Sequence, residues 1–282
     1  MASKNSGNKN LMENILFYFG IFIFLIFIVF PFFWQFMTSI KPMKELYLTP
    51  PKWIPSAINF EFYYSVFYKR PFLTYLKNSA VVAGSSTLFA VFVSSFAAYA
   101  LSRLNFKGKG LIMSMVLAVS MFPGISIVSS LFIMMRQVNL LNSYIGLVIT
   151  YITITMPLSI FILTTFFREI PFSLEEAAKV DGASPLQAFM LVIFPLAAPG
   201  LFTTAILVFI SSWNEFLYSL VFNTKENMRT VPVGIAMFPG DFSYPWGDIA
   251  AASVVVTVPL IILVLVFQRR IISGLTAGAV KG

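Results

Sequence analysis

The chain has 282 residues, of which 58% are hydrophobic and only 11% are charged, and a water-soluble protein of this length could not hide so much apolar surface in its core. Cysteine and histidine are both absent, which excludes thiol nucleophiles, most transition-metal sites and every catalytic scheme that needs imidazole. The formal net charge of +8 comes from basic residues scattered among segment ends and loops, so membrane lipid is a simpler partner for them than nucleic acid.

Long apolar runs predict an all-α protein that crosses the membrane six times. A helix needs about 20 predominantly apolar residues to span the hydrocarbon core of a bilayer. Runs of this kind occupy residues 15–37, 78–101, 111–135, 144–167, 196–222 and 249–267. Pro123, Pro157 and Pro259 lie inside three of them, where prolines are tolerated and often mark bends. We therefore expect residues 1–282 to form a single transmembrane domain.

The distribution of lysine and arginine predicts that both termini are cytoplasmic. With the N-terminus inside, basic residues such as Arg103, Lys107 and Arg168 fall in cytoplasmic segments, as the positive-inside rule requires. Segment 41–77 argues the other way, because it would lie outside and is itself rich in basic residues. The predicted orientation therefore depends partly on the family resemblance described below.

Residues 174–199, with the sequence LEEAAKVDGASPLQAFMLVIFPLAAP, interrupt the apolar runs with charges and helix-ending residues. Ser173 precedes Glu176 by three residues, which is the spacing of a capping box, so a short helix is expected to begin at Leu174. The sequence Asp181-Gly182 is expected to end this helix, because glycine readily takes the left-handed geometry found after a helix C-terminus.

A second short helix is predicted after this glycine turn. Ser184 and Pro185 have the residue types of an N-cap and a first helical position, and the apolar run that follows continues to Pro195. Ala177 and Ala178 would leave the first helix with a shallow face against which another protein could pack. A plain re-entrant or interfacial loop is the alternative that the pattern alone leaves open.

One ionisable group lies within a predicted span. Glu215 and its neighbours Ser211 and Asn214 fall in the middle of the fifth run, where a carboxyl group is costly and normally faces a bundle interior or a wet cavity. These three residues are therefore candidates for lining a transport pathway. Alternatively, Asn214 and Glu215 bond to neighbouring helices and hold the bundle together. A proton relay is disfavoured, because its partner groups are missing from the sequence.

The segment between the fifth and sixth runs combines aromatic residues with glycine and proline turn signals. Its aromatic residues are Phe238, Phe242, Tyr244 and Trp246. Aromatic faces suit sugar rings or a protein partner, whereas an aromatic belt at the membrane interface is the alternative interpretation.

Several residues of the central stretch have the spacing of a known motif, and together they resemble the EAA loop of the permease subunits of ABC importers. The matching residues are Glu176-Ala177-Ala178, Asp181-Gly182-Ala183, Ile193, Pro195 and Pro199. The sequence Trp213-Asn214-Glu215-Phe216 and the C-terminal run from Gln268 to Gly282 look like the carbohydrate-uptake branch. They closely resemble the six-helix permease of maltose- and trehalose-type transporters, and the resemblance covers essentially the whole chain.

The resemblance implies contacts with partner subunits at three places. Residues 168–195 would form a cytoplasmic helix-turn-helix coupling loop that docks on the ATPase through Glu175, Glu176, Ala177, Ala178, Asp181, Gly182, Ala183 and Pro195. The cytoplasmic tail, residues 268–282, would reach the ATPase through Gly274, Thr276, Gly278 and Lys281. The loop with Phe238, Phe242, Tyr244 and Trp246 would meet an extracytoplasmic sugar-binding protein.

The resemblance also implies a multi-pass subunit of a prokaryotic inner or plasma membrane. Its expected partners are a second permease subunit, with which it forms a heterodimer, and two copies of a cytoplasmic ATPase. The chain has no phosphate-cradling GxxxxGK[ST] element, so we expect a non-catalytic subunit with no metal or cofactor of its own. ATP and Mg²⁺ would bind to the partner ATPase.

The function that follows from the resemblance is uptake of a maltose- or trehalose-type di- or oligosaccharide by alternating access. In close relatives most sugar contacts belong to the other permease subunit, which argues against direct sugar binding by Asn214 and Glu215. A permease for another carbohydrate or for a glycerol-phosphate-like solute is the alternative. A secondary transporter is disfavoured, because the sequence has no detectable internal repeat and only one glutamate inside a predicted span.

Overall fold

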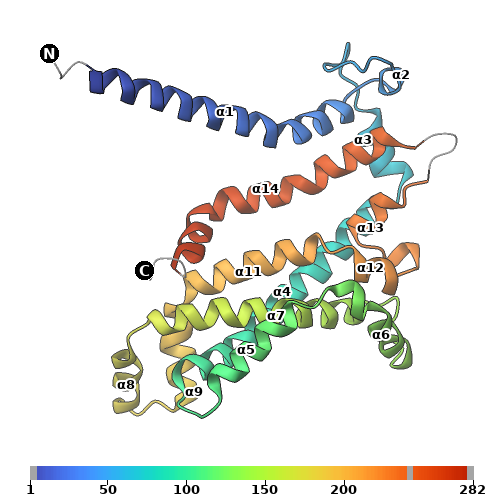
Figure 1. Cartoon of the computed structure of the whole chain (residues 1–282). Coiled ribbons are helices and arrows are strands. Elements are labelled where there is room, and N and C mark those ends of the chain that lie inside the picture. Colours follow the sequence, from blue (N-terminus) through green and yellow to red (C-terminus); the bar gives the residue numbers. More distant parts are fainter. Residues whose placement is uncertain (1–4, 240–243, 278–282) are drawn as a thin grey trace. The chain divides into compact units, whose positions relative to one another are not determined.

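The computed structural model describes residues 5–239 and 244–277, with side chains over residues 13–239 and 244–268. Within these ranges every regular element is helical, so the predicted all-α class is confirmed (Figure 1). The chain divides into two compact units. Unit 1 comprises Met1–Arg70 and Phe238–Val255, and unit 2 comprises Pro71–Met237 and Val256–Gly282.

Unit 1 begins with the long helix α1 (Asn5–Ser39). The most apolar 18-residue window of this helix contains no buried residue, as expected for a helix that is surrounded by lipid. The short helices α2 (Met43–Leu46), α3 (Glu61–Tyr64) and the π-helix η1 (Ser65–Lys69) follow. The first part of α14 (Trp246–Ala277) completes the unit.

The segment between α1 and α3 is organised around the carboxylate of Glu45. Lys52 Nζ donates to Glu45 Oε1 at 2.8 Å, and Ser56 donates to the same carboxylate through its hydroxyl group and through its backbone N–H. These hydrogen bonds, first of all that from Lys52, lower the pKa of Glu45 from an ordinary value of 4.5 to about 2. The residues after α2 form no regular element up to α3, and the hydrogen bonds to the Glu45 carboxylate hold them in place.

Three long helices form the centre of unit 2. They are α4 (Phe72–Arg103), α7 (Tyr144–Glu169) and α11 (Ala198–Trp213), and each contacts the other two. Small buried residues recur every four positions along α4, at Ser86, Ala90, Ser94 and Ala98. Such small residues let helix backbones approach closely, which drives helix packing in lipid, where burial from water contributes little.

Two of the predicted spans are each built from more than one helix. The third consists of α5 (Lys109–Ser120) and α6 (Gly124–Gln137), which meet at 91°. Pro123 lies at this bend. It accounts for the bend, because proline lacks a backbone N–H and disfavours helical geometry at the preceding residue. The fifth, residues 196–222, contains α11 and, after a break, α12 (Leu217–Phe222). The helical stretch Pro185–Leu196, which precedes this span, meets α11 at 75°. Within the described residues, four single helices are long and apolar enough to cross a membrane, and the number of spans rises to six if each bent pair is one span. The number of crossings therefore stays a prediction.

The remaining elements of unit 2 are short. They are α8 (Phe172–Val180), α9 (Pro185–Ala188), the π-helix η2 (Phe189–Ile193), α10 (Phe194–Leu196), the 3-10 helix η3 (Glu226–Met228) and α13 (Val231–Ala236).

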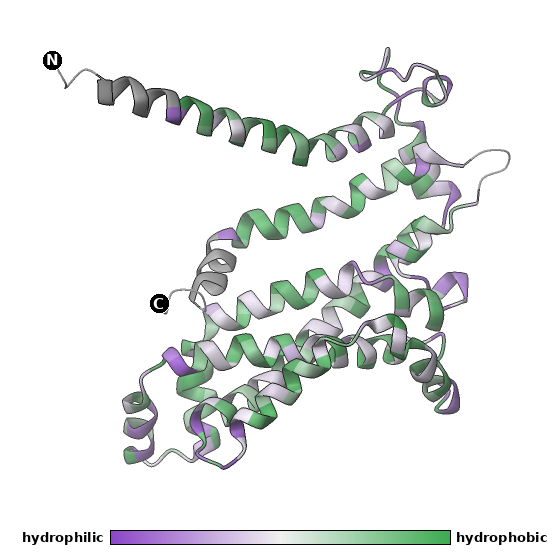
Figure 2. Cartoon of the chain, viewed as in Figure 1, coloured by the Kyte–Doolittle hydropathy of each residue, from purple (hydrophilic) through white to green (hydrophobic). Residues whose placement is uncertain are grey.

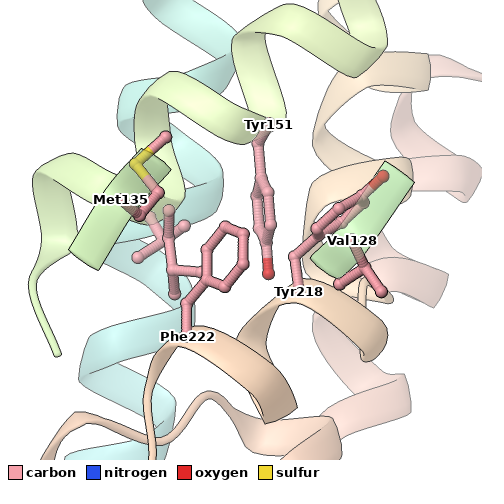
Figure 3. Close-up of a cluster of buried hydrophobic side chains, with 7 residues drawn as sticks. Val128, Met135, Tyr151, Tyr218 and Phe222 are labelled. Carbon is pink, nitrogen blue, oxygen red and sulfur yellow. The ribbon is translucent and has the colours of Figure 1, made fainter. Parts of the chain in front are cut away.

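Separate clusters of buried side chains hold the two ends of α4. Near its N-terminal end a cluster joins α4, α6, α7 and α12 through Val82, Val128, Met135, Leu147, Tyr151, Tyr218 and Phe222. In Figure 3 the side chain of Tyr151 extends between those of Phe222 and Tyr218. A second cluster packs the C-terminal end of α4 against α7 and the helices that follow it, through Ala98, Leu163, Phe167, Phe189, Ile193 and Ala197.

The lowered pKa of Glu45 gives a pH dependence with a defined sign. The carboxylate stabilises segment 41–60 above its ordinary pKa, and this stabilisation is lost as the pH falls from 4.5 towards about 2. Amide hydrogen exchange of the segment, corrected for intrinsic rates, should therefore show protection near neutral pH that disappears over that range. Glu45→Gln should lower the protection already at neutral pH, whereas the exposed Glu61→Gln should not; equal protection in both variants would contradict the role of Glu45.

Candidate functional site

The helix α8 begins after Pro171, not at Leu174. Pro171 has φ −57° and ψ 135°, so helical geometry starts at the next residue, Phe172, and no side chain caps the helix. Ser173 already lies inside the first turn, where its hydroxyl group cannot act as an N-cap. The predicted capping box of Ser173 and Glu176 is therefore wrong.

The turn predicted at Gly182 is present. Gly182 has φ +89°, a left-handed conformation that residues with a Cβ rarely adopt. Its N–H donates to the carbonyl of Lys179 at 3.1 Å, and the N–H of Ala183 donates to that of Ala178 at 2.9 Å. This pair of bonds is the Schellman arrangement, which satisfies carbonyl groups left open at the end of α8.

The second short helix carries the capping box of this segment. Ser184 Oγ accepts from the N–H of Gln187 at 3.3 Å, and Gln187 Oε1 accepts from the N–H of Ser184 at 2.8 Å. The sequence Ser184-Pro185-Leu186-Gln187 is the signal for such a box, although only its first two residues entered the sequence prediction. Pro195 does not end the helix, because the π-helical turn η2 precedes it and helical geometry continues to Leu196.

The loop of α8, turn and second helix has an outer face that mixes charged residues with exposed apolar ones such as Val180 and Leu186. The residues Glu176, Ala177, Asp181 and Gly182 are exposed, whereas Ala178 and Ala183 are half-buried. Figure 2 shows hydrophilic residues along α8, in contrast to the mainly apolar helix α7 before it. This exposed face includes most of the positions that the sequence analysis assigned to contact with a partner.

Glu175 differs from its neighbours, because its side chain is turned into the protein and is only 5% exposed. Its Oε1 accepts from the hydroxyl group of Tyr99 at 2.9 Å and from Lys179 Nζ at 2.8 Å, while Arg103 Nε lies 3.8 Å from Oε2. Burial raises the pKa of Glu175, but hydrogen bonds from Lys179 and Tyr99 and the charges of Lys179 and Arg103 outweigh it and lower the pKa. Glu175 is therefore held as a carboxylate by its own chain.

Arg103 is a residue of this site that sequence reasoning missed, since it was considered only as a basic residue at the end of a span. Its Nη2 donates to the carbonyl of Ile170 at 2.7 Å, and its guanidinium group lies over the ring of Phe172 at 4.3 Å. No local pattern could have found this contact, because Arg103 and Glu175 are far apart in the sequence and lie on different helices.

The fifth predicted span is interrupted at Glu215, which corrects the expectation that residues 211–216 lie in mid-helix. Helix α11 ends at Trp213, and the Glu215 carboxylate accepts from the backbone N–H groups of Tyr218 at 2.8 Å and Ser219 at 3.1 Å. A side chain that binds backbone N–H groups in this way competes with helix continuation. The hydroxyl group of the buried Tyr151 donates to the same carboxylate at 2.5 Å. Glu215 thus caps α12, which was not predicted, and it bonds to the neighbouring helix α7 through Tyr151, as the structural alternative expected of this residue.

The other two pathway candidates lie close to this break. Ser211 and Asn214 are exposed, and Asn214 Nδ2 donates to the carbonyl of Ile210 at 3.0 Å. Ser211 also lines a cavity of about 70 Å³ between α7 and α11. Pockets for small-molecule ligands usually measure about 300–1,000 Å³, so this cavity is too small for a sugar.

The aromatic residues before α14 have different environments. Phe238 is buried in unit 1, with the guanidinium group of Arg70 at 5.2 Å from its ring centre. Tyr244 and Trp246 are exposed, with ring centres 4.6 Å apart, and the hydroxyl group of Tyr47 donates to the carbonyl of Tyr244 at 3.0 Å. Phe242 lies outside the described residues.

The four tail positions are only partly described. Gly274 and Thr276 belong to the last turns of α14, which continues past the predicted end of the sixth run. Gly278 and Lys281 lie outside the described residues.

Comparison with known proteins places the chain among transport components. Residues 90–276 match the family described as binding-protein-dependent transport system inner membrane component. A trehalose transport system permease protein of Mycobacterium tuberculosis is 47% identical over 89% of this chain and 92% of its own length. A trehalose/maltose transport system permease protein of Thermococcus litoralis is 44% identical over 97% and 99%. A sulfoquinovosyl glycerol transport system permease protein of Agrobacterium fabrum is 44% identical over 90% and 89%.

A solved structure has the same fold. It is a crystal structure of a bacterial ABC transporter involved in the import of the acidic polysaccharide alginate, and one of its chains matches with a TM-score of 0.79. The match covers 95% of this chain and 98% of that chain, at 24% sequence identity. At this identity the likeness concerns the fold alone.

The capping contacts of Glu215 predict the effect of its removal. Glu215→Ala deletes the acceptor of two backbone N–H groups and of the Tyr151 hydroxyl group, so the free energy of unfolding should fall by about 1–3 kcal/mol. Glu215→Gln keeps one carbonyl oxygen and should lose less. Asn214→Ala is the matched control, because Asn214 is exposed. Unfolding of the purified protein in detergent measures this order, and equal losses for Glu215→Ala and Asn214→Ala would contradict the capping role.

Proposed function

Because the chain belongs to the family of binding-protein-dependent transport system inner membrane components, we propose that it forms half of the pathway by which a prokaryotic importer takes up a maltose- or trehalose-type di- or oligosaccharide. The chain is a permease subunit of a sugar ABC importer and is not catalytic, since a separate ATPase hydrolyses ATP in such importers. In this proposal a second permease subunit supplies the other half of the pathway, and two copies of a cytoplasmic ATPase drive it.

The proposed sugar comes from the names of three relatives that are about equally similar to this chain. Two of them are named for trehalose or for trehalose and maltose, at 47% and 44% identity. A third, at 44%, is named for sulfoquinovosyl glycerol, which also contains a sugar ring. The two trehalose-type relatives favour a glucose-containing disaccharide, with a sulfonated glycoside as the second candidate.

The coupling role is assigned to the exposed face of the loop between α7 and α11. Glu176, Ala177, Asp181 and Gly182 leave a small, polar surface that suits docking in a cleft of a cytoplasmic ATPase. The half-buried Ala178 and Ala183 would support this surface from behind, and the exposed Pro195 remains a candidate for contact. Glu175 is buried against Tyr99 and Arg103, so we assign it no contact with the ATPase.

Contacts at the other assigned places follow the same division between exposed and buried residues. The exposed pair Tyr244 and Trp246 suits contact with an extracytoplasmic sugar-binding protein, whereas the buried Phe238 supports the fold of unit 1. Ser211 and Asn214 are exposed and remain the candidates for the pathway wall. With the coupling loop in the cytoplasm, both termini would be cytoplasmic and the tail of α14 would approach the ATPase.

A pair of substitutions at Gly182 tests the coupling role. Valine at φ +89° should cost about 1–2 kcal/mol of local strain, while asparagine tolerates the left-handed region, and a Cβ atom at this position has no neighbouring atom within 4 Å. Gly182→Val should therefore leave membrane insertion intact and lower sugar uptake per ATP hydrolysed in proteoliposomes that contain the whole complex, and Gly182→Asn should keep most of it. Normal uptake by Gly182→Val would overturn the assignment of this turn to the docking surface.

A competition assay tests the proposed substrate class. Uptake of labelled trehalose by the reconstituted complex with its binding protein should be inhibited by unlabelled maltose more strongly than by sulfoquinovosyl glycerol. Stronger inhibition by sulfoquinovosyl glycerol would replace the proposed sugar by a sulfonated glycoside. Absence of trehalose uptake, together with no uptake of labelled maltose, would contradict the disaccharide proposal.

A further inference from the structure

The last turns of α4 contact three parts of the coupling loop, although α4 is not next to the loop in the sequence. Arg103 donates to the carbonyl of Ile170 in the linker after α7 and lies over the ring of Phe172 at the start of α8. The ring of Tyr99 packs on that of Phe189 in the second short helix, with ring centres 4.6 Å apart. The linker, the first helix and the second helix of the loop therefore all meet one end of α4.

The loop is joined to the helices before and after it by short non-helical segments. Between α7 and α8 the chain leaves helical geometry at Ile170 and Pro171, and between the second short helix and α11 it bends by 75° at Ala197. Non-helical joints of this kind absorb rotation, as hinge residues do. A force on the exposed face of the loop would swivel it about these two joints unless another contact fixed it.

The buried cluster around Phe189 holds the second helix of the loop against α4, and the buried ion pair of Glu175 and Arg103 is the charged contact that holds α8 there. Their side chains are 5% and 1% exposed, so each charge has lost most of its water. Arg103 depends on Glu175 for its counter-charge, while Glu175 also bonds to Lys179 and Tyr99. Arg103 Nε and Nη1 find no hydrogen-bond partner among the described residues, which leaves the carboxylate of Glu175 and the ring of Phe172 to compensate the charge. Separation of the pair would leave the buried guanidinium group of Arg103 without its counter-charge, whereas Glu175 would keep its bond to Lys179 within α8. The cost falls on Arg103, so α8 and α4 should move together.

We propose that Glu175 and Arg103 are positioning residues that deliver the movement of the coupling loop to α4. This inference rests on the proposed function, in which the loop docks on the ATPase. Because α4 packs against both α7 and α11, a displacement of α4 reaches the whole centre of unit 2. Glu176 and its exposed neighbours then receive the force, and Glu175, one residue earlier, transfers it.

Lys179 provides the matched control for this role. It bonds to the same oxygen of Glu175, Oε1, at 2.8 Å, but its side chain is 47% exposed and lies on α8 itself, four residues further on. An ion pair between residues of one helix cannot connect that helix to another, and the exposed ammonium group of Lys179 can be hydrated when the pair is lost. Lys179→Gln should therefore leave sugar uptake per ATP hydrolysed unchanged.

The test compares single and double variants in the complete transporter, reconstituted in proteoliposomes. Glu175→Gln leaves Arg103 buried without a counter-charge and is expected to lower stability as well as coupling. Arg103→Met combined with Glu175→Leu removes both charges, a replacement that is often neutral for stability. We expect this double variant to melt near the wild-type temperature and yet to transport about fivefold less sugar per ATP hydrolysed, or lower still.

A docking measurement separates this inference from the proposed function. The sequence has no cysteine, so a photo-reactive group can be attached at Val180→Cys alone, on a side chain that is 87% exposed. Cross-linking to the ATPase in the wild-type background and in the double variant, together with reduced transport per ATP, supports the inference. Wild-type transport per ATP in the double variant overturns it, and so does loss of cross-linking in that variant alone. Absence of cross-linking in the wild-type background would instead overturn the proposed docking, and with it the inference.

Discussion

The buried ion pair between Arg103 of α4 and Glu175 of α8 is the interaction on which the arrangement of the coupling loop depends. The two side chains are 1% and 5% exposed, so neither charge can return to water without unpacking the loop. Separating such a buried pair therefore costs more free energy than separating an exposed pair. The aromatic contact of Tyr99 with Phe189 lies next to the pair and extends the connection to the second short helix. An apolar loop surface would allow sliding here, whereas paired charges fix one register.

The same use of a carboxylate recurs at the other end of unit 2. Glu215 orders the start of α12 through two backbone N–H groups and is itself held by Tyr151. In unit 1 the carboxylate of Glu45 orders a segment with little secondary structure. A chain with only 11% charged residues thus places several of its few acidic side chains where they fix backbone geometry. This distribution fits a protein whose task is to transmit movement and whose chemistry takes place in a partner.

The sequence predicted what depends on local residue types and could not predict what depends on distant contacts. The left-handed turn at Gly182 follows from glycine alone, and the bend at Pro123 follows from proline. The capping box at Ser173 failed because Pro171 starts the helix earlier, and the break before α12 was missed because hydropathy does not register a carboxylate that caps a helix. The pairing of Arg103 with Glu175 joins two helices far apart in the chain, so only the fold could bring it to light.

The central claim, that the coupling loop and α4 move as one body, is tested most directly by a distance measurement during the transport cycle. Because the chain has no cysteine, spin labels can be attached at Ser173→Cys on α8 and at Val93→Cys on α4, which are both exposed. Pulsed electron paramagnetic resonance on the complete transporter then gives the distance between the labels without nucleotide and with ATP bound. The account predicts the same distance distribution in both states. A shift of the distribution on ATP binding would show that the loop moves relative to α4 and would contradict the account.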